Sequence, residues 1–328
     1  MRLAARAVAL GALLTLSGCA GAPAAVTARD GAEPRWQDVF DTTPQALLVF
    51  RPKALRRDRL YGPLLRRTIE AAREQSRVLW ATPLGAMEDA DEIIASFPPL
   101  RATSSGDADP RPGEYVVVVR GVRADLDPVR LVDADGRPVW TAGPGGAVPE
   151  LLRESDERGK PVDASLFELP GRTWVIAAGE ARPRAREAFA HPMNRPVFQL
   201  DPDALAAVRF DGPSLVAYLH ERVERSPGTG LIVALGHRLR SATVELPPAM
   251  QGPDARGTIR ATLSYLDEES AGVAEIAAAD AAGALSRAKP SPLSWLGAAT
   301  VQRAGANLIV TVDLPKPLLV GLLHADPL

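Results

Sequence analysis

Two stretches of the chain, 150 residues apart, share more residues than their length would suggest. Residues 51–65 read RPKALRRDRLYGPLL and residues 201–215 read DPDALAAVRFDGPSL. The identical positions in the first stretch are Pro52, Ala54, Leu55, Arg59, Gly62, Pro63 and Leu65. Chance would give about one or two identities over such a stretch. We therefore expect two similar units in tandem, and this restricts the fold more than any other feature.

The patterns around the repeat predict the same elements in each unit. Short apolar or β-branched runs indicate strands at residues 47–50, 93–97 and 115–119, and again at 197–200, 242–246 and 258–265. Gly62-Pro63 and Gly212-Pro213 are expected to open amphipathic helices, because proline is tolerated in the first turn. The second strand of each unit ends at a Pro-Pro pair, at 98–99 and 247–248.

The later part of each unit predicts a further helix and a hairpin. Helices are expected to start at Asp127-Pro128 and at Asp267, and the second is expected to cover Ser270–Ala288. Its buried face is expected to carry Val273, Ile276, Ala277 and Ala284. Hairpins are predicted at 165–178 and 300–312, each followed by a helix, from about Arg182 and from about Lys316.

This order of elements predicts an α+β fold of two tandem similar modules, with mostly antiparallel sheets and helices packed on them. A doubly wound parallel sheet fits the order less well. The expected boundaries are 1–18 for a signal peptide, 19–43 for a flexible tether, 44–192 for the first module and 193–328 for the second. The tether is inferred from the low periodicity of Ala20–Thr43, and ~24 flexible residues reach about 25 to 30 Å.

The first residues have the layout of a signal peptide. Arg2 and Arg6 precede an apolar stretch at 7–16 that is too short to span a bilayer, and the stretch ends in Leu16-Ser17-Gly18-Cys19. This ending resembles the lipobox of bacterial lipoproteins. The resemblance implies cleavage before Cys19, a diacylglyceryl thioether on its sulfur and usually an acyl chain such as palmitate on the new amino terminus.

Ala20 follows the cysteine where an aspartate would retain such a protein at the inner membrane, so the resemblance favours transfer to the outer membrane of the cell envelope if the host has one. The alternative is an ordinary secreted protein whose Cys19 is discarded with the signal peptide. Cys19 is the only cysteine, so the mature chain forms no internal disulfide. The layout of the body resembles that of uncharacterised duplicated α+β lipoproteins of GC-rich bacteria, which implies no activity.

The charge balance disfavours a nucleic-acid partner. The chain has 38 Lys and Arg against 40 Asp and Glu, so no strong positive field exists. Nearly all the basic residues are arginines, which could indicate phosphate binding. Because these arginines are scattered, a GC-rich genome explains them better.

Two groups of acids were considered as metal or catalytic sites. Asp133-Ala134-Asp135-Gly136 resembles the opening of a calcium loop, but Pro144 occupies the twelfth position where a bidentate acid is needed, so we expect a hairpin turn. A second acidic group could supply paired carboxylates, although solvated loop acids are the simpler interpretation. That group comprises Glu88, Asp89, Asp91, Glu92, Asp107 and Asp109.

The remaining candidates give no cofactor or metal site. His191, His220, His237 and His324 include no pair at i, i+4 spacing, so no zinc site is expected. Gly228-Thr229-Gly230 and Gly143-Pro144-Gly145-Gly146 lack the rest of a nucleotide-binding motif and are expected to be loops. Tryptophans could line a ligand groove, although Trp174 is expected in the core. They are Trp36, Trp80, Trp140, Trp174 and Trp295.

The sequence favours a membrane-tethered envelope lipoprotein with a non-enzymatic binding role. It identifies no catalytic, cofactor-binding or metal residues, and Cys19 is the single predicted site residue, for lipid attachment. The expected partners are the membrane, through the lipid anchor, and either a partner protein or a small apolar ligand bound at a cleft between the modules. The alternative is an envelope hydrolase whose catalytic residues meet only in the folded chain.

Overall fold

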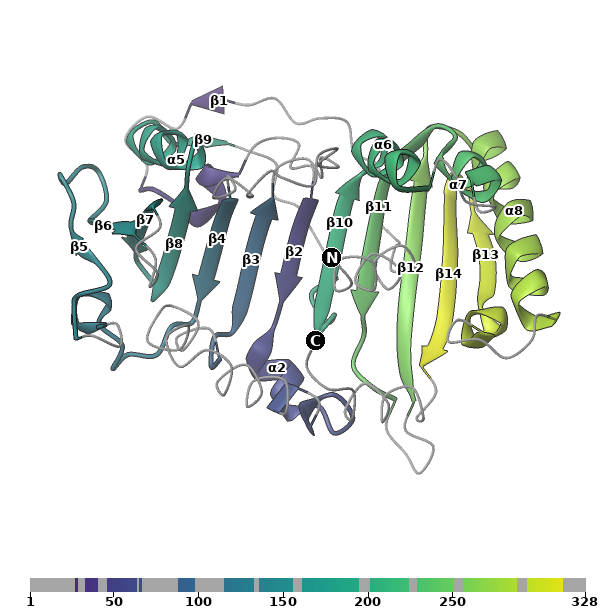
Figure 1. Cartoon of the computed structure of the whole chain (residues 1–328), viewed down its shortest axis with the longest axis horizontal. Coiled ribbons are helices and arrows are strands. Elements are labelled where there is room, and N and C mark those ends of the chain that lie inside the picture. Colours follow the sequence, from purple (N-terminus) through teal and green to yellow (C-terminus); the bar gives the residue numbers. More distant parts are fainter. Residues whose placement is uncertain are drawn as a thin grey trace.

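A single antiparallel sheet of 12 strands forms the centre of the molecule (Figure 1). The computed structural model describes residues 27–28, 33–40, 46–63, 65–66, 88–97, 115–132, 136–155, 161–194, 201–223, 229–250, 256–287 and 294–314. Helices lie at both ends of the strands, with α2 (Pro52–Arg57) at the lower end in Figure 1.

The strands divide between the two predicted units. The first unit contributes β2 (Ala46–Phe50), β3 (Glu92–Phe97), β4 (Tyr115–Arg120), β5 (Thr141–Ala142), β6 (Glu150–Ser155), β7 (Pro161–Leu169) and β8 (Thr173–Ala178). The second contributes β10 (Ala206–Asp211), β11 (Leu239–Leu246), β12 (Gly257–Tyr265), β13 (Thr300–Ala304) and β14 (Asn307–Leu314). A separate two-stranded sheet joins β1 (Thr27–Ala28) to β9 (Met193–Asn194).

The other described helices follow the strands in chain order. The α-helices are α5 (Ala181–Ala190), α6 (Gly212–Val223), α7 (Thr229–Gly236) and α8 (Glu268–Arg287). The 3-10 helices are η1 (Trp36–Val39), η2 (Pro128–Arg130) and η3 (Ser294–Ala298).

The strand order confirms the predicted α+β class with antiparallel sheet. From the centre outward the first unit runs β2-β3-β4-β8-β7 and the second runs β10-β11-β12-β14-β13, so the same order occurs twice. β2 and β10 pair antiparallel, with Leu48 opposite Val208, and this pair joins the two units. The sequence predicted antiparallel sheets but did not predict that they are continuous.

The repeated sequence and the repeated strands are not in the same register. The offset of 150 aligns Pro52, at the start of α2, with Pro202, which precedes β10. Yet β2 and β10 occupy equivalent places in the sheet and begin at Ala46 and Ala206, 160 residues apart. The strand expected at 197–200 lies outside the described residues, as do most of the helix expected after Pro63 and the helix expected from Lys316.

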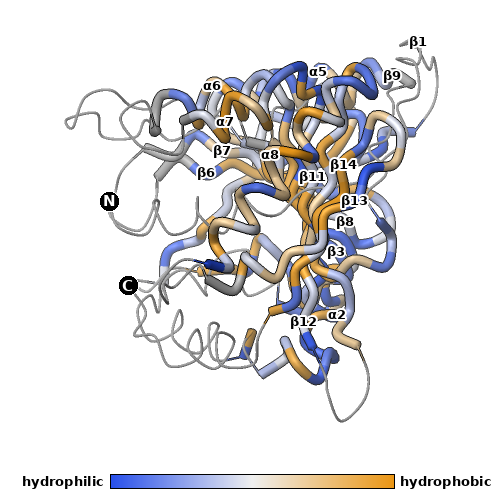
Figure 2. The backbone as a smooth tube through the Cα atoms, turned by 90° about the vertical axis from the view of Figure 1, so that its right-hand side faces the viewer, coloured by the Kyte–Doolittle hydropathy of each residue, from blue (hydrophilic) through white to orange (hydrophobic). Residues whose placement is uncertain are grey.

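The two faces of the sheet are buried differently. The face with Leu48, Val208 and Val244, called here the helical face, carries α6, α7 and α8 over the second unit. The opposite face of the first unit packs against α5 and η1, through Phe167, Val175 and Phe189. Figure 2 shows α6 and α8 to one side of the sheet. In the first unit, apolar side chains are buried on both faces of the sheet. In the second unit, the face opposite the helical face carries polar side chains such as Thr243, Arg260 and Thr262.

The helix expected from Asp127-Pro128 is wrong. Asp127 does cap a helical turn, its carboxylate accepting the Val129 N–H, but that turn is η2, three residues long. The residues that follow form β5 and β6 instead of a helix. Prolines at 128, 138, 144 and 149 prevent helix propagation here, because proline lacks the N–H and obstructs the preceding turn.

The helix at the equivalent position of the second unit is confirmed as α8, but its predicted buried face is wrong. Val273 and Ile276 are 47% and 66% exposed, whereas Ala271 and Ala274 are fully buried. The small side chains allow α8 to approach the sheet closely, so the helix turns its alanines inward. Apolar periodicity alone could not distinguish the two sides, because alanine occurs on both.

Two segments expected to be irregular are structured. Within the predicted tether, η1 packs on α5 and Phe40 is buried in the core of the first unit, because Trp36, Val39 and Phe40 supply apolar area that a flexible linker lacks. Thr229, expected in a loop, begins α7, whose run of apolar residues from Leu231 to Leu235 packs between α6 and α8. The loop predicted at 143–146 is confirmed.

Candidate functional site

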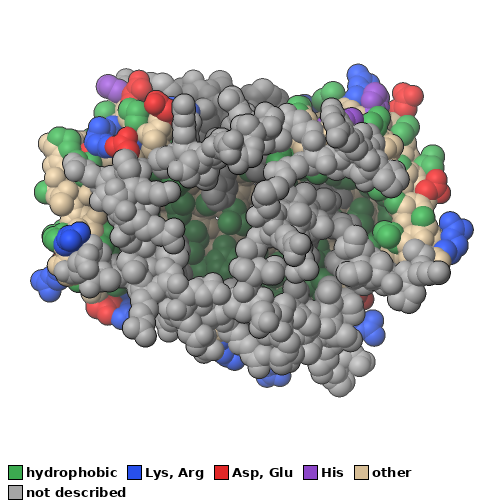
Figure 3. Space-filling view, in the orientation of Figure 1, with side chains coloured by type: hydrophobic (Ala, Val, Ile, Leu, Met, Phe, Trp, Pro, Cys, Tyr) green, Lys and Arg blue, Asp and Glu red, His purple; other side chains and the backbone are tan. Residues whose placement is uncertain are grey.

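The helical face carries partly exposed apolar side chains where the two units join. Five residues on four adjacent strands, called here the junction surface, share this face and are neither fully buried nor fully exposed: Leu48, Phe50, Ile93, Val117 and Val208. Figure 3 shows hydrophobic side chains near the centre of this face, with charged groups toward the ends of the molecule. The junction surface lies between the core of the first unit and that of the second.

Backbone and side-chain contacts hold the two units together beside this surface. The guanidinium of Arg51 donates to the carbonyl of Asp201 at 3.0 Å and to that of Ala204, and the Arg51 N–H donates to the Leu205 carbonyl at 2.9 Å. Arg51 also binds Glu92 on β3, with Nη2 3.0 Å from Oε1. One arginine therefore bonds the end of β2 both to its own unit and to the segment that enters β10.

The segment after α2 crosses into the second unit. Leu55 and Tyr61 are buried against Val244 and Ile259 of the second unit. Asp58 stabilises the crossing, because its Oδ1 accepts the N–H of Tyr61 at 3.0 Å while its Oδ2 accepts the N–H of Ala249 at 3.0 Å. The two predicted modules thus share a core as well as a sheet.

The described acids of the candidate carboxylate group are paired with cations. Glu88 and Asp89 bind Arg56, and Lys53 Nζ lies 2.7 Å from Asp91 Oδ1. Glu92 binds both Arg51 and Arg120, whose guanidinium also lies over the Trp36 ring at 5.4 Å. These carboxylates are neutralised by ion pairs and do not converge on a metal site. Asp107 and Asp109 lie outside the described residues.

A second ionic group lies on the opposite face of the second unit. Arg260 donates to Glu245 Oε2 from Nε at 2.9 Å and to Asp201 Oδ2 from Nη2 at 2.6 Å. The pKa of Asp201 is lowered, chiefly by the N–H of Asp203 and then by Arg260. Glu245 is almost fully buried, so Arg260 supplies the charge that its carboxylate needs away from water.

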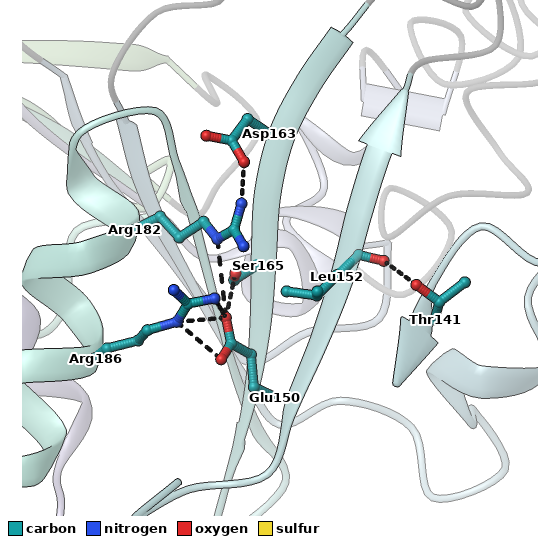
Figure 4. Close-up of polar contacts among 7 residues, drawn as sticks. All are labelled: Thr141, Glu150, Leu152, Asp163, Ser165, Arg182 and Arg186. Atoms are coloured by element: carbon teal, nitrogen blue, oxygen red, sulfur yellow. Dashed lines mark hydrogen bonds and ion pairs between the residues drawn. The ribbon is translucent and has the colours of Figure 1, made fainter. Parts of the chain in front are cut away.

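A third ionic cluster, with a buried carboxylate, binds α5 to the edge of the first unit (Figure 4). Glu150 on β6 accepts from Arg186 through both oxygens, at 2.9 Å from Nε, and also accepts the hydroxyl hydrogen of Ser165 on β7. Arg182, one turn before Arg186 on α5, has its Nε 3.9 Å from Glu150 Oε1 and also pairs with Asp163. Asp163 adopts a left-handed conformation with φ of 44°, which aspartate tolerates better than most residues.

The Glu150 cluster supports structure better than catalysis. Ser165 is fully buried, and the carboxylate of Glu150 is already held by Arg186, so neither group faces a position that a substrate could occupy. None of the sequence patterns indicated a role for Glu150, Arg182, Arg186, Arg51 or Asp58. The sequence does contain a signal for the Glu150 cluster. Arg182 and Arg186 have i, i+4 spacing, which places two cations on one side of a helix and predicts an acidic partner.

Burial also shifts the pKa of several other groups, among them Tyr61, Tyr265 and Glu168. Burial raises the pKa of Tyr61 to about 12, and burial raises the pKa of Tyr265, whose hydroxyl donates to the Leu235 carbonyl at 2.9 Å. The pKa of Glu168 is raised, first by burial and then by the nearby charge of Asp127. The tyrosines therefore stay protonated in the folded chain well above neutral pH.

The other sequence candidates are dispersed. His191 caps the end of α5, His220 lies on α6, His237 follows α7, and His324 lies outside the described residues. Val132 bridges Pro138 antiparallel, as expected for a hairpin turn, although Asp133 and Asp135 are not described.

Three of the five tryptophans can be placed by their side chains. Trp174 is buried as predicted, Trp140 is also buried, and Trp36 lies beside Arg120 and Phe40. Trp80 lies outside the described residues. Trp295 lies in η3, but its side chain is not described.

Within the described ranges, no group of three or more His, Cys, Asp or Glu side chains could hold a metal ion. No helix among the described residues has the length and apolar character needed to cross a membrane. Cys19, the predicted lipid attachment site, lies outside the described residues.

Comparison with protein-family models gives no match, and comparison with curated proteins gives none either. Among solved structures, crystal form I of TP0453 is similar with a TM-score of 0.47 and 11% identity, covering 90% of this chain and 98% of that one. Crystal form III of TP0453 gives a TM-score of 0.45 and 9% identity, covering 91% of this chain and 100% of that one. A likeness at this level says nothing about function.

Proposed function

We propose that the protein is a lipid-anchored lipoprotein of the bacterial envelope that binds a small apolar molecule at the junction surface, without catalysing a reaction. The observation that carries the binding role is the partial exposure of apolar side chains on four neighbouring strands of the helical face. Partly exposed apolar side chains gain free energy when a ligand displaces water from them.

The surroundings of the junction surface favour binding over chemistry. The described acids nearest to the junction are held in ion pairs with Arg51, Arg56 and Arg120, mostly on the opposite face of the sheet. The surface itself contributes Leu48, Phe50, Ile93, Val117 and Val208, which supply area and shape but no acid, base or nucleophile. Lipid attachment at Cys19 supplies the location, since two or more acyl chains hold a protein on a bilayer.

The binding role is tested with N-phenyl-1-naphthylamine, an uncharged dye whose fluorescence rises in apolar surroundings, added to the mature chain prepared without lipid. Val117→Thr and Val208→Thr change an apolar methyl to a hydroxyl of the same size, so each should weaken binding several-fold with little change in packing volume. Val273→Thr, on the exposed side of α8, is the matched control and should bind as the unaltered chain does.

Binding that is lost in the two junction variants but kept in Val273→Thr supports the proposal. Absence of dye binding to the unaltered chain contradicts it. Equal weakening in all three variants contradicts it as well, because the dye would then be binding elsewhere.

A further inference from the structure

The pairing of β1 with β9 shortens the connection between Cys19 and the folded body. Thr27 lies opposite Asn194, and Ala28 lies opposite Met193, so residues 27–28 are hydrogen-bonded to the segment that links the two units. The following residues pack as well, because Trp36 and Val39 of η1 lie against the core that contains α5. The chain is therefore attached to the body at position 27, and not first at about position 44 as the predicted tether implied.

Eight residue steps separate Cys19 from Thr27. Eight residues reach at most about 28 Å when fully extended. A flexible chain of that length has a typical end-to-end distance of about 16 Å. If Cys19 carries acyl chains, as the proposed function requires, β1 lies at most about 28 Å from the bilayer surface.

The position of β1 on the molecule decides which side can face the bilayer. Figures 1 and 2 agree that β1, β9 and α5 lie together at one end of the strands, and that α2 lies at the other end. β12 has nine residues and spans about 30 Å along the strand direction. If the α2 end contacted the bilayer, the residues between Cys19 and Thr27 would have to extend along the whole length of the strands. That length, about 30 Å, is greater than the roughly 28 Å that these residues span when fully extended.

We infer that the protein stands on the membrane with the end that carries β1, β9 and α5 toward the lipid, and that the end carrying α2 and the β11–β12 connection points away. This inference rests on the lipid anchor of the proposed function and adds an orientation to it. It assigns the bilayer surface as the neighbour of α5, whose exposed side includes Arg184 and Glu187.

The orientation is measured by energy transfer from a dye on the protein to labelled lipid headgroups, with the lipidated full-length mature protein reconstituted in vesicles. Because Cys19 is the only natural cysteine and its sulfur is acylated in this account, an introduced cysteine is the only reactive thiol. Glu187→Cys places the dye on α5, and Met250→Cys places it in the β11–β12 connection, where Met250 is 67% exposed. Transfer from position 187 should be several-fold higher than transfer from position 250.

Two insertions of the same Gly-Ser linker test whether β1 sets the orientation. An insertion after Ala24 lengthens the connection between Cys19 and β1, so it should reduce the difference between positions 187 and 250. The same insertion after Asp30 lies beyond β1, so it should leave the difference unchanged. A reduced difference in both would show that β1 does not hold the chain and would overturn the inference.

The outcomes separate the inference from the proposed function. Equal transfer from both positions, or higher transfer from 250, on protein that floats with the vesicles overturns the orientation and leaves the lipid anchor intact. Protein that fails to float with vesicles, in the same way as a Cys19→Ala control, overturns the anchor and the orientation together.

Discussion

At the scale of single residues, the shared Gly-Pro pair of the two units has a physical explanation. A Cβ on Gly62 would lie 2.5 Å from the Arg56 carbonyl oxygen, and a Cβ on Gly212 would lie 2.2 Å from the Leu239 carbonyl oxygen. In both copies the backbone approaches a carbonyl so closely that only glycine fits. The sequence indicated that these positions matter, but the close approach is visible only in the folded chain.

We predict that Gly212→Ala lowers the free energy of unfolding by about 1 to 3 kcal/mol or more, because backbone atoms cannot move aside as a flexible side chain can. Gly272→Ala is the matched control, since a Cβ there meets nothing within 4 Å and lies inside α8. It should raise the free energy of unfolding by about 0.5 to 1 kcal/mol. Urea unfolding followed by circular dichroism measures both, and an equal effect of the two substitutions would refute the account of Gly212.

Glu150 provides a second prediction at this scale. Removing its buried carboxylate leaves Arg182 and Arg186 without their shared acid, so Glu150→Ala should cost about 3 kcal/mol or more. Glu275→Ala removes an acid from the more exposed pair with Arg303, and should cost less than about 1 kcal/mol. Thermal unfolding of the two variants side by side is the measurement. A loss for Glu150→Ala as small as that for Glu275→Ala would show that the cluster does not stabilise α5.

At the scale of elements, strands were predicted better than helices. The strands at 47–50, 93–97, 115–119, 242–246 and 258–265 and both hairpins are present, because alternation and turn residues are local signals. The sequence could not predict β5, β6 or the register between β2 and β10. Two-residue strands such as β5 depend on a neighbour that only the fold supplies, and register depends on long-range pairing.

The orientation of α8 gives the prediction at this scale. Ala274→Ile should destabilise the protein by about 1 to 3 kcal/mol, because the larger side chain would separate the helix from the sheet. Ile276→Ala, on the exposed side, should change stability by less than about 0.5 kcal/mol. Urea midpoints of the two variants test this. If Ile276→Ala destabilised the protein more than Ala274→Ile, then Val273 and Ile276 would face the sheet, as the sequence predicted.

At the scale of the whole molecule, the two units form one cooperative structure. The second unit needs Leu55 and Tyr61 of the first for its core, and it needs β2 to cover the edge of β10. We expect one unfolding transition by calorimetry for the mature chain. The fragment 193–328 alone should lack a cooperative transition. Two separate transitions in the full chain, or a stably folded fragment, would show that the units are independent.

The candidate site could be predicted only in outline. The sequence predicted a binding site at a cleft between the units, and this stays a prediction. The residues of the junction surface could not be named from the sequence, because they belong to four strands that are distant in sequence. Those candidate carboxylates that the structure describes bind arginines and a lysine, and such charge pairing across loops and strands leaves no local pattern in the sequence. Lipidation of Cys19 stays a prediction, and it rests on a short linear motif that does not depend on the fold.

The account depends most on the sulfur of Cys19. Mass spectrometry of the N-terminal peptide from the native, membrane-extracted protein tests it most directly. The account predicts a mature chain that begins at Cys19, with the mass of a diacylglyceryl group on its thioether. A chain that begins elsewhere, or an unmodified Cys19 at the amino terminus, would contradict both the membrane anchor and the orientation inferred from it.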